Sequence, residues 1–112
     1  MTSAPRDVRV YLDDILTSIS RIEKYVEGMS MDQFRADSKT TDAVVRNLEI
    51  IGETVKKIPE DVRTAHPAIQ WRPAAAMRDF LIHDYPSVDI EAVWNTIKED
   101  LPPFKEGIEG VE

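Results

Sequence analysis

The sequence contains no cysteine among its 112 residues. A disulfide framework, a thiolate nucleophile and a cysteine-based zinc site are therefore excluded, and nothing in the composition points to an oxidising compartment. Residues 1–7 also lack the apolar stretch of a secretion signal. We therefore expect a cytoplasmic protein.

Several other patterns are missing. The sequence has no apolar run long enough to cross a membrane, no stretch with the two-residue period of a strand, and no internal repeat. It also has no His-x-x-Glu or His-Glu-x-x-His pattern, no acidic calcium loop and no glycine-rich phosphate loop. We therefore expect a soluble all-α protein that needs no metal or other cofactor and has no contact with a membrane.

Positive charge is scarce, because 14 Lys and Arg stand against 21 Asp and Glu and give a formal net charge of −7. Phosphate binding depends on Lys and Arg, so this balance argues against a protein that coats nucleic acid by general electrostatics. Residues 56–83 differ, since they hold five basic and three acidic residues and carry +2, whereas the rest carries −9. That stretch can form a locally positive site or an ordinary solvated surface.

The overall composition is typical of a folded globular domain. Hydrophobic residues make up 42% of the chain and charged residues 31%. A length of 112 residues matches one compact domain, so we expect a single domain over 1–112 with a loose tail at about 109–112. Trp71 and Trp94 are expected to anchor the core or an interface rather than to stack on bases.

Apolar residues recur every three or four positions in three stretches, which predicts three long amphipathic helices. The first covers about 8–26. The second begins after the polar residues 38–41 and ends at Pro59. The third runs over about 90–108, and the prolines at 102 and 103 are expected to bend it.

Shorter elements are expected between these helices. Ser30 predicts the N-cap of a short helical turn. Prolines divide residues 59–73 into short turns and prepare a helix from Ala74 to about His83. Gly52, inside the second helix, is expected to let a neighbouring helix approach closely. The whole pattern predicts an all-α, up-down bundle of five to six helices.

The segment from Arg78 to Tyr85 combines side chains that suit phosphodiester chemistry. Arg78, His83 and Tyr85 are interleaved there with apolar residues. Imidazole can take up or release a proton near neutral pH, and guanidinium stays charged and can bind two oxygens of a phosphate. These groups fit the attack of a ribose 2′-hydroxyl on the adjacent phosphate, a reaction that needs no metal.

The spacing of these residues complicates a site within one chain. On an ideal α-helix Arg78 and His83 would lie roughly 140° apart and would not share a face. Either the helix unwinds at His83, or a second chain completes the site across a two-fold axis. Arg78 and Tyr85 would lie within roughly 20° of each other if the helix continued, but Pro86 opposes that continuation.

Three blocks occur in an order that resembles one known family. In chain order they are the stretch RNLEIIGE at 46–53, the Arg-x4-His-x-Tyr pattern at 78–85, and the stretch at 88–102, which contains Val-Asp, VWNTI and Asp-Leu-Pro. Trp71 precedes the Arg-x4-His-x-Tyr pattern. Together they resemble the HepT-like toxins of the HEPN superfamily over about residues 8–108. The resemblance implies a HEPN-like helical bundle that acts as a toxin, a metal-independent endoribonuclease with its site at a homodimer interface.

The resemblance also implies roles for individual residues. Arg78 and His83 would be catalytic. Asp79 falls where the family most often has an asparagine that helps to position the histidine, and an acid there would also raise the pKa of the histidine. Tyr85 falls on the tyrosine that a partner antitoxin, a minimal nucleotidyltransferase, modifies with AMP. Such a group would place bulk and negative charge beside the arginine and block RNA.

Ordinary structural roles remain open for the same side chains. Arg78 can form a surface ion pair with Asp79 or Asp84. His83 can stabilise a helix end through the helix dipole, and Tyr85 can be a half-buried aromatic residue. The alternative for the whole protein is a non-catalytic helical module that binds a nucleotidyltransferase, and the acidic composition favours it.

Overall fold

The computed structural model describes residues 7–79 and 89–111. This part of the chain is almost entirely helical and contains no strand, which confirms the predicted all-α class. Its elements in chain order are α1 (Val8–Tyr25), α2 (Met31–Ala36), α3 (Ser38–Val55), α4 (Glu60–Ala65), α5 (Trp71–Ala75), the 3₁₀ turn η1 (Ala76–Arg78), α7 (Ile90–Asn95), the π-helical stretch η2 (Thr96–Asp100) and α8 (Leu101–Glu109). Among the described helices, none is long and apolar enough to cross a membrane.

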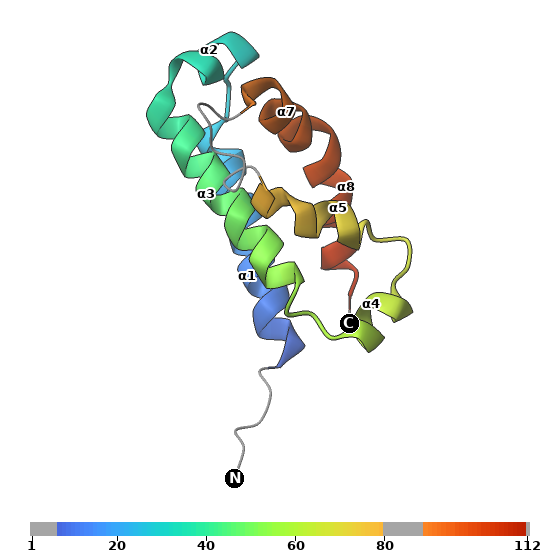
Figure 1. Cartoon of the computed structure of the whole chain (residues 1–112). Coiled ribbons are helices and arrows are strands. Elements are labelled where there is room, and N and C mark those ends of the chain that lie inside the picture. Colours follow the sequence, from blue (N-terminus) through green and yellow to red (C-terminus); the bar gives the residue numbers. More distant parts are fainter. Residues whose placement is uncertain (1–6, 80–88, 112) are drawn as a thin grey trace.

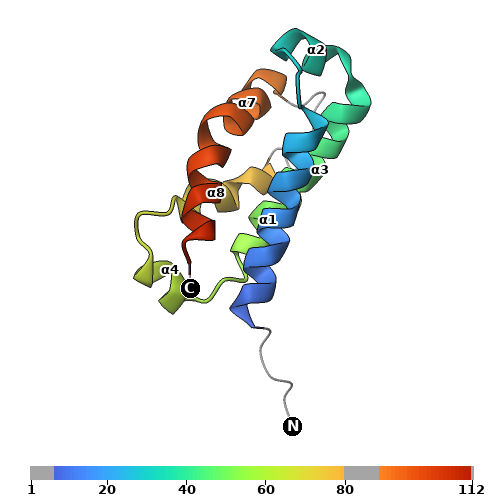
Figure 2. The ribbon, with the colours of Figure 1, turned by 180° about the vertical axis from the view of Figure 1, so that it is seen from behind.

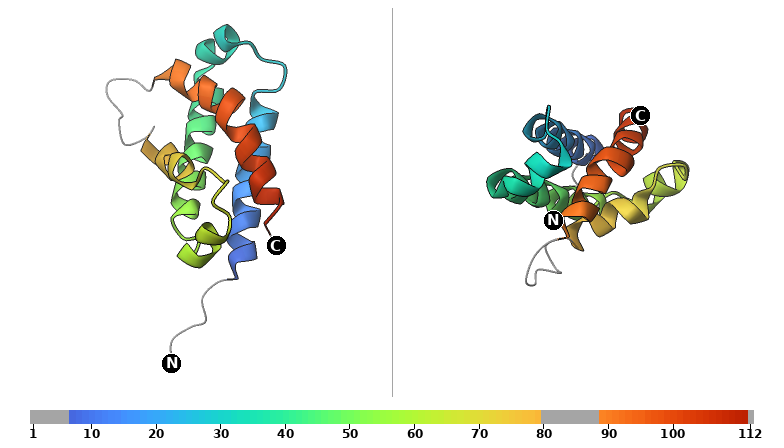
Figure 3. Two further views of the ribbon diagram at one scale, coloured as in Figure 1. Left: turned by 90° about the vertical axis from the view of Figure 1, so that its right-hand side faces the viewer. Right: turned by 90° about the horizontal axis from the view of Figure 1, so that it is seen from above.

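The two longest helices, α1 and α3, form the centre of the bundle. They run antiparallel and side by side, as Figure 1 shows. Seen from behind in Figure 2, α8 packs along the other side of α1. The short helix α5 and the turn η1 lie across α3, which the side view in Figure 3 makes clear. The core therefore lies where α1 and α3 meet the shorter elements.

The apolar stripes predicted from the sequence are the ones that are buried. Burying an aliphatic side chain fully contributes about 1.5–3 kcal/mol, so two such stripes packed together dominate the stability of the bundle. The buried residues on α1 and α3 include Leu12, Ile15, Ile19, Ile22, Val44, Val45, Leu48, Ile51 and Val55.

Capping residues decide where α2 and α3 begin. Ser30 caps α2 as predicted, because its Oγ accepts a hydrogen bond from the Gln33 N–H at 3.1 Å and the Gln33 side chain accepts one from the Ser30 N–H at 2.9 Å. The prediction that α3 begins after residue 41 was wrong. The Asp37 carboxylate accepts hydrogen bonds from the backbone N–H of Thr40 at 3.0 Å and from its hydroxyl at 2.8 Å, so α3 begins at Ser38. These two bonds lower the pKa of Asp37 from its ordinary value of 3.8.

The third long helix changes pitch before its prolines. Asp89 caps its start, because its side chain accepts a hydrogen bond from the Ala92 N–H at 3.1 Å. The helix does not continue as one regular α-helix to residue 108, since η2 is a π-helical stretch. Pro102 and Pro103 cannot donate a backbone hydrogen bond, and their rings crowd the carbonyls four residues earlier, so the preceding turn widens.

Two other segments are more regular than predicted. Residues 59–73 were expected to form short turns, but they contain α4, and α5 begins two residues before Pro73. Residues 109–112 were expected to be loose. Glu109 still belongs to α8, and Val111 is half-buried against the core and donates a backbone hydrogen bond to Ile108 at 3.1 Å. The apolar side chain of Val111 explains the difference. Glu112 lies outside the described residues.

Both tryptophans pack against the core, as the sequence predicted. Trp71 is buried, its indole N–H donates to the carbonyl of His66 at 3.0 Å, and its ring meets that of Phe104 edge-on at 6.3 Å. Trp94 is half-buried, with its ring centroid 5.2 Å from that of Phe34. Neither ring is a free platform for stacking on a base.

A neighbouring element packs closely against α3 at Gly52. A Cβ added there would lie 2.7 Å from the backbone nitrogen of Arg78 and 2.8 Å from the carbonyl oxygen of Ala75. Both are backbone atoms, so neither can rotate away as a flexible side chain would. The expectation that Gly52 allows a close approach is therefore confirmed, and the element that approaches is the one that carries Arg78.

We expect the substitution Gly52→Ala to lower the free energy of unfolding. Alanine would favour the helix by about 1 kcal/mol. Overpacking a close contact costs about 1–3 kcal/mol, and here the colliding atoms belong to backbone, so the cost should exceed the gain. Urea denaturation followed by circular dichroism measures the difference.

Gly110→Ala is the matched control, because the nearest atom to a Cβ at that position is at an ordinary distance of 3.6 Å. If Gly52→Ala were as stable as Gly110→Ala, the packing of η1 on α3 would not require a glycine at position 52.

Candidate active site around Arg78

Arg78 is the last residue of a 3₁₀ turn that lies directly on α3. A 3₁₀ turn advances roughly 120° per residue, compared with roughly 100° in an α-helix. The prediction of a continuous α-helix from Ala74 was therefore wrong at residues 76–78. The angle of roughly 140° expected between Arg78 and His83 assumed that α-helix, so it does not describe this segment.

The structure describes two of the four predicted site residues. Arg78 and Asp79 lie within the described part of the chain, whereas His83 and Tyr85 lie outside the described residues. The expected helix end near His83 or Asp84 also lies outside them. The described part of the site is therefore Arg78 and the residues that contact it.

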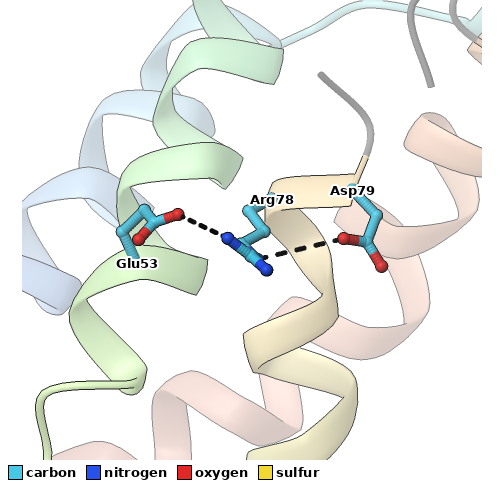
Figure 4. Close-up of polar contacts among 3 residues, drawn as sticks. All are labelled: Glu53, Arg78 and Asp79. Atoms are coloured by element: carbon cyan, nitrogen blue, oxygen red, sulfur yellow. Dashed lines mark hydrogen bonds and ion pairs between the residues drawn. The ribbon is translucent and has the colours of Figure 1, made fainter. Parts of the chain in front are cut away.

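The guanidinium of Arg78 lies between two carboxylates, as Figure 4 shows. Its Nη1 donates a hydrogen bond to Oε1 of Glu53 at 3.1 Å. Its Nε lies 4.0 Å from Oδ1 of Asp79, too far for a hydrogen bond. Neither contact uses the second terminal nitrogen, Nη2. Glu53 therefore binds one terminal nitrogen of the guanidinium, the group whose paired N–H donors suit a phosphate.

All three side chains are partly open to solvent. The exposed fraction is 35% for Arg78, 49% for Glu53 and 47% for Asp79. Exposed ion pairs contribute about 0–1 kcal/mol to stability, so this cluster is not needed to hold the fold together. With one cation and two carboxylates the cluster carries a formal charge of −1.

Glu53 was not identified as a site residue from the sequence. The sequence suggested that Arg78 pairs with Asp79 or Asp84. In the structure Arg78 lies closer to Glu53, on α3, than to Asp79. The available signal was its position, because Glu53 follows Gly52 in the block at 46–53. The role predicted for Asp79, which is to help position His83, stays a prediction because His83 lies outside the described residues.

Other basic residues lie on, or directly after, the elements that meet here. Lys56 and Lys57 are exposed and follow Glu53 by about one turn, and Arg72 is exposed on α5. They belong to the stretch at 56–83 that carries +2. The cations needed to attract a phosphate chain are thus near the elements that carry Arg78, although Arg78 itself is paired with an acid.

A cavity lies beside the turn that carries Arg78. Its volume is about 170 Å³, it lies next to η1, between α5 and α8, and its lining is mainly apolar and does not include Arg78. Within residues 7–79 and 89–111, no group of three or more His, Asp or Glu side chains gathers where it could hold a metal ion. The chemistry offered by the described residues is therefore that of a guanidinium and two carboxylates.

Comparison with known proteins extends far beyond this cluster. The family model described as ribonuclease HepT-like matches residues 15–111. A protein of Thermococcus cleftensis, named "Probable ribonuclease HepT", is 47% identical over 100 residues, which cover 89% of this chain and 91% of that protein. Two proteins of Methanocaldococcus jannaschii, named as candidate RNases, are 41% and 39% identical. These matches cover 95% and 96% of this chain, and 91% and 92% of the two relatives.

No solved structure gives a significant match. The sequence matches span most of the chain and agree with the helical bundle and with the order of the motif blocks. The chain therefore belongs to the ribonuclease HepT-like family of the HEPN superfamily.

Proposed function

We propose that this protein is the toxin of a toxin–antitoxin pair and that it cleaves cytoplasmic RNA as a metal-independent endoribonuclease. Its site would combine Arg78 and His83 at the interface of a homodimer. The observation that carries the proposal is a partly exposed arginine at the start of the Arg-x4-His pattern, in a chain of a ribonuclease family.

The reaction follows from the chemistry of the two side chains. The ribose 2′-oxygen attacks the adjacent phosphorus, the O2′–P bond forms and the P–O5′ bond breaks. An imidazole accepts the 2′ proton, and a second imidazole protonates the leaving 5′ oxygen. The two copies of His83 in a homodimer can supply this base and this acid. Arg78 binds the non-bridging oxygens and stabilises the negative charge that develops on them.

The position of Arg78 supports a site shared by two chains. The arginine and both neighbouring carboxylates are partly exposed, and the cavity next to η1 does not include them. In-line attack requires the nucleophile, phosphorus and leaving group to be held in one geometry, which these three partly exposed side chains do not provide by themselves. A second copy of the chain would enclose the phosphate and bring the second imidazole.

We expect Arg78→Ala and His83→Ala each to lower the rate of RNA cleavage by about 10²-fold or more, because each removes a group that acts in the transition state. Neither variant should change the dimer, and both should lose growth inhibition. EDTA should leave the wild-type rate unchanged. Cleavage of an end-labelled RNA measures the rate, and Arg21→Ala, which removes an exposed arginine from α1, is the control.

The alternative is a non-catalytic helical module that binds a nucleotidyltransferase. The formal net charge of −7 is the observation that favours it, because RNA is repelled by an acidic surface. Purified dimer that never cuts RNA in EDTA, yet binds its nucleotidyltransferase tightly, would establish this alternative and refute the enzyme.

We also propose that a cognate minimal nucleotidyltransferase silences the toxin by adenylylating Tyr85. The phenol oxygen would attack the α-phosphorus of ATP, a Tyr85 O–P bond would form, and pyrophosphate would leave as the phenol proton is lost. The product would carry a phosphate a few residues from Arg78. Its negative charge and bulk would compete with the RNA backbone for the guanidinium.

We expect toxin purified after co-expression with the antitoxin to carry the mass of one AMP group on Tyr85. Tyr85→Phe should stay unmodified and remain toxic in the presence of the antitoxin. Tyr25→Phe is the control, because Tyr25 is an exposed tyrosine on α1. Peptide mass spectrometry locates the group, and an unmodified Tyr85 in a silenced complex would show that the antitoxin acts by steric cover.

A further inference from the structure

Two consecutive residues of α3 act on Arg78. Gly52 lets the backbone nitrogen of Arg78 approach, and Glu53 accepts a hydrogen bond from the far end of its side chain at 3.1 Å. One turn of one helix thus contacts both ends of the arginine, and Figure 4 shows the contact made by Glu53. Gly52 and the neighbours of Glu53 toward the C-terminus, Thr54 and Val55, are buried, so this turn is a rigid support.

We propose that Glu53 is a positioning residue, which fixes the guanidinium of Arg78 in the orientation that a transferring phosphate requires. This inference rests on the proposed ribonuclease function. Nothing in the family comparison assigns a role to Glu53.

An arginine side chain has several rotatable bonds and stays mobile unless a partner orders it. Arg78 stands at the end of a short turn with about a third of its side chain exposed, so without a partner it would sample many rotamers. The Glu53 carboxylate binds Nη1 and leaves Nη2, on the other terminal position, outside this contact. A guanidinium held along one edge can still bind a phosphate through the remaining donors.

The same carboxylate must also weaken RNA binding. It places a negative charge 3.1 Å from the cation that contacts the phosphate, and Asp79 adds a second one nearby. Positioning therefore raises the rate of the bound complex while the charge lowers affinity. Glu53 therefore raises both kcat and KM, and these two changes act in opposite directions on kcat/KM. A residue that only stabilised the fold would change neither constant of the folded enzyme.

The variants that test this are Glu53→Ala and Glu53→Gln. Alanine removes both the hydrogen bond and the charge, whereas glutamine removes the charge and keeps an oxygen that can accept from Nη1. Glu23→Gln is a closely matched control. Glu23 accepts from Lys105 at 3.2 Å, and the exposed fractions of that pair, 49% and 35%, equal those of Glu53 and Arg78.

We expect Glu53→Ala to lower kcat roughly tenfold, in line with the loss caused by small misplacements of a reacting group. Its KM should fall, because a repulsive charge is gone, and that fall should shrink as salt is raised. Glu53→Gln should show the same fall in KM but retain more of kcat. The melting temperature should change no more than in Glu23→Gln.

Three results would overturn the inference. They are an unchanged kcat in Glu53→Ala, a kcat that rises because Glu53 merely competes with the phosphate, and losses in both Glu53 variants that follow the fraction of unfolded protein.

A second measurement keeps this test separate from that of the ribonuclease function. The ¹⁵Nε–¹H relaxation of Arg78, recorded without RNA, reports the order of its side chain. We expect Arg78 to lose order in Glu53→Ala and not in Glu23→Gln. If the wild type cut no RNA while Arg78 still lost order, the ribonuclease function would fail and Glu53 would still position Arg78. If Arg78 stayed equally ordered in Glu53→Ala, the inference about Glu53 would fail even if the wild type cut RNA.

Discussion

The site depends on one close contact, the approach of η1 onto α3 at Gly52. Any side chain at that position would push against the backbone of Ala75 and Arg78. The contact fixes where the chain leaves α5, and so it fixes where the Arg-x4-His pattern begins on the surface of the bundle. The long apolar stripes of α1 and α3 make this support rigid, because their side chains are fully buried against each other.

Electrostatics then limits what the site can do. The chain as a whole is acidic, and Arg78 lies between Glu53 and Asp79, so a single chain attracts RNA weakly. Lys56, Lys57 and Arg72 supply positive charge on the adjoining elements. An enzyme built this way would gain its rate from the orientation of a few groups rather than from strong electrostatic binding. Because its RNA binding is weak, one added phosphate group near Arg78 would be enough to inhibit it.

Local patterns predicted much of the fold. The stripe of α1 and the N-cap at Ser30 follow from residues near one another in the chain. Gly52 predicted a close approach, but not which element approaches. The start of α3 was missed because the polar run that looked like a linker follows a capping aspartate, Asp37. The π-helical stretch was missed because its cause, a pair of prolines, lies after it in the chain.

The candidate site was harder to predict for a similar reason. Arg78 was found from its spacing to His83, but Glu53 lies 25 residues away on another helix, and only the folded chain brings the two together. Mixed dimers test the central claim, a site shared by two chains, most directly. A dimer that combines one wild-type chain with one His83→Ala chain should cleave RNA far more slowly than half the wild-type rate, because the shared site then lacks either its base or its acid. Verified mixed dimers that kept about half of the wild-type rate would show that each chain holds its own site and would contradict the claim.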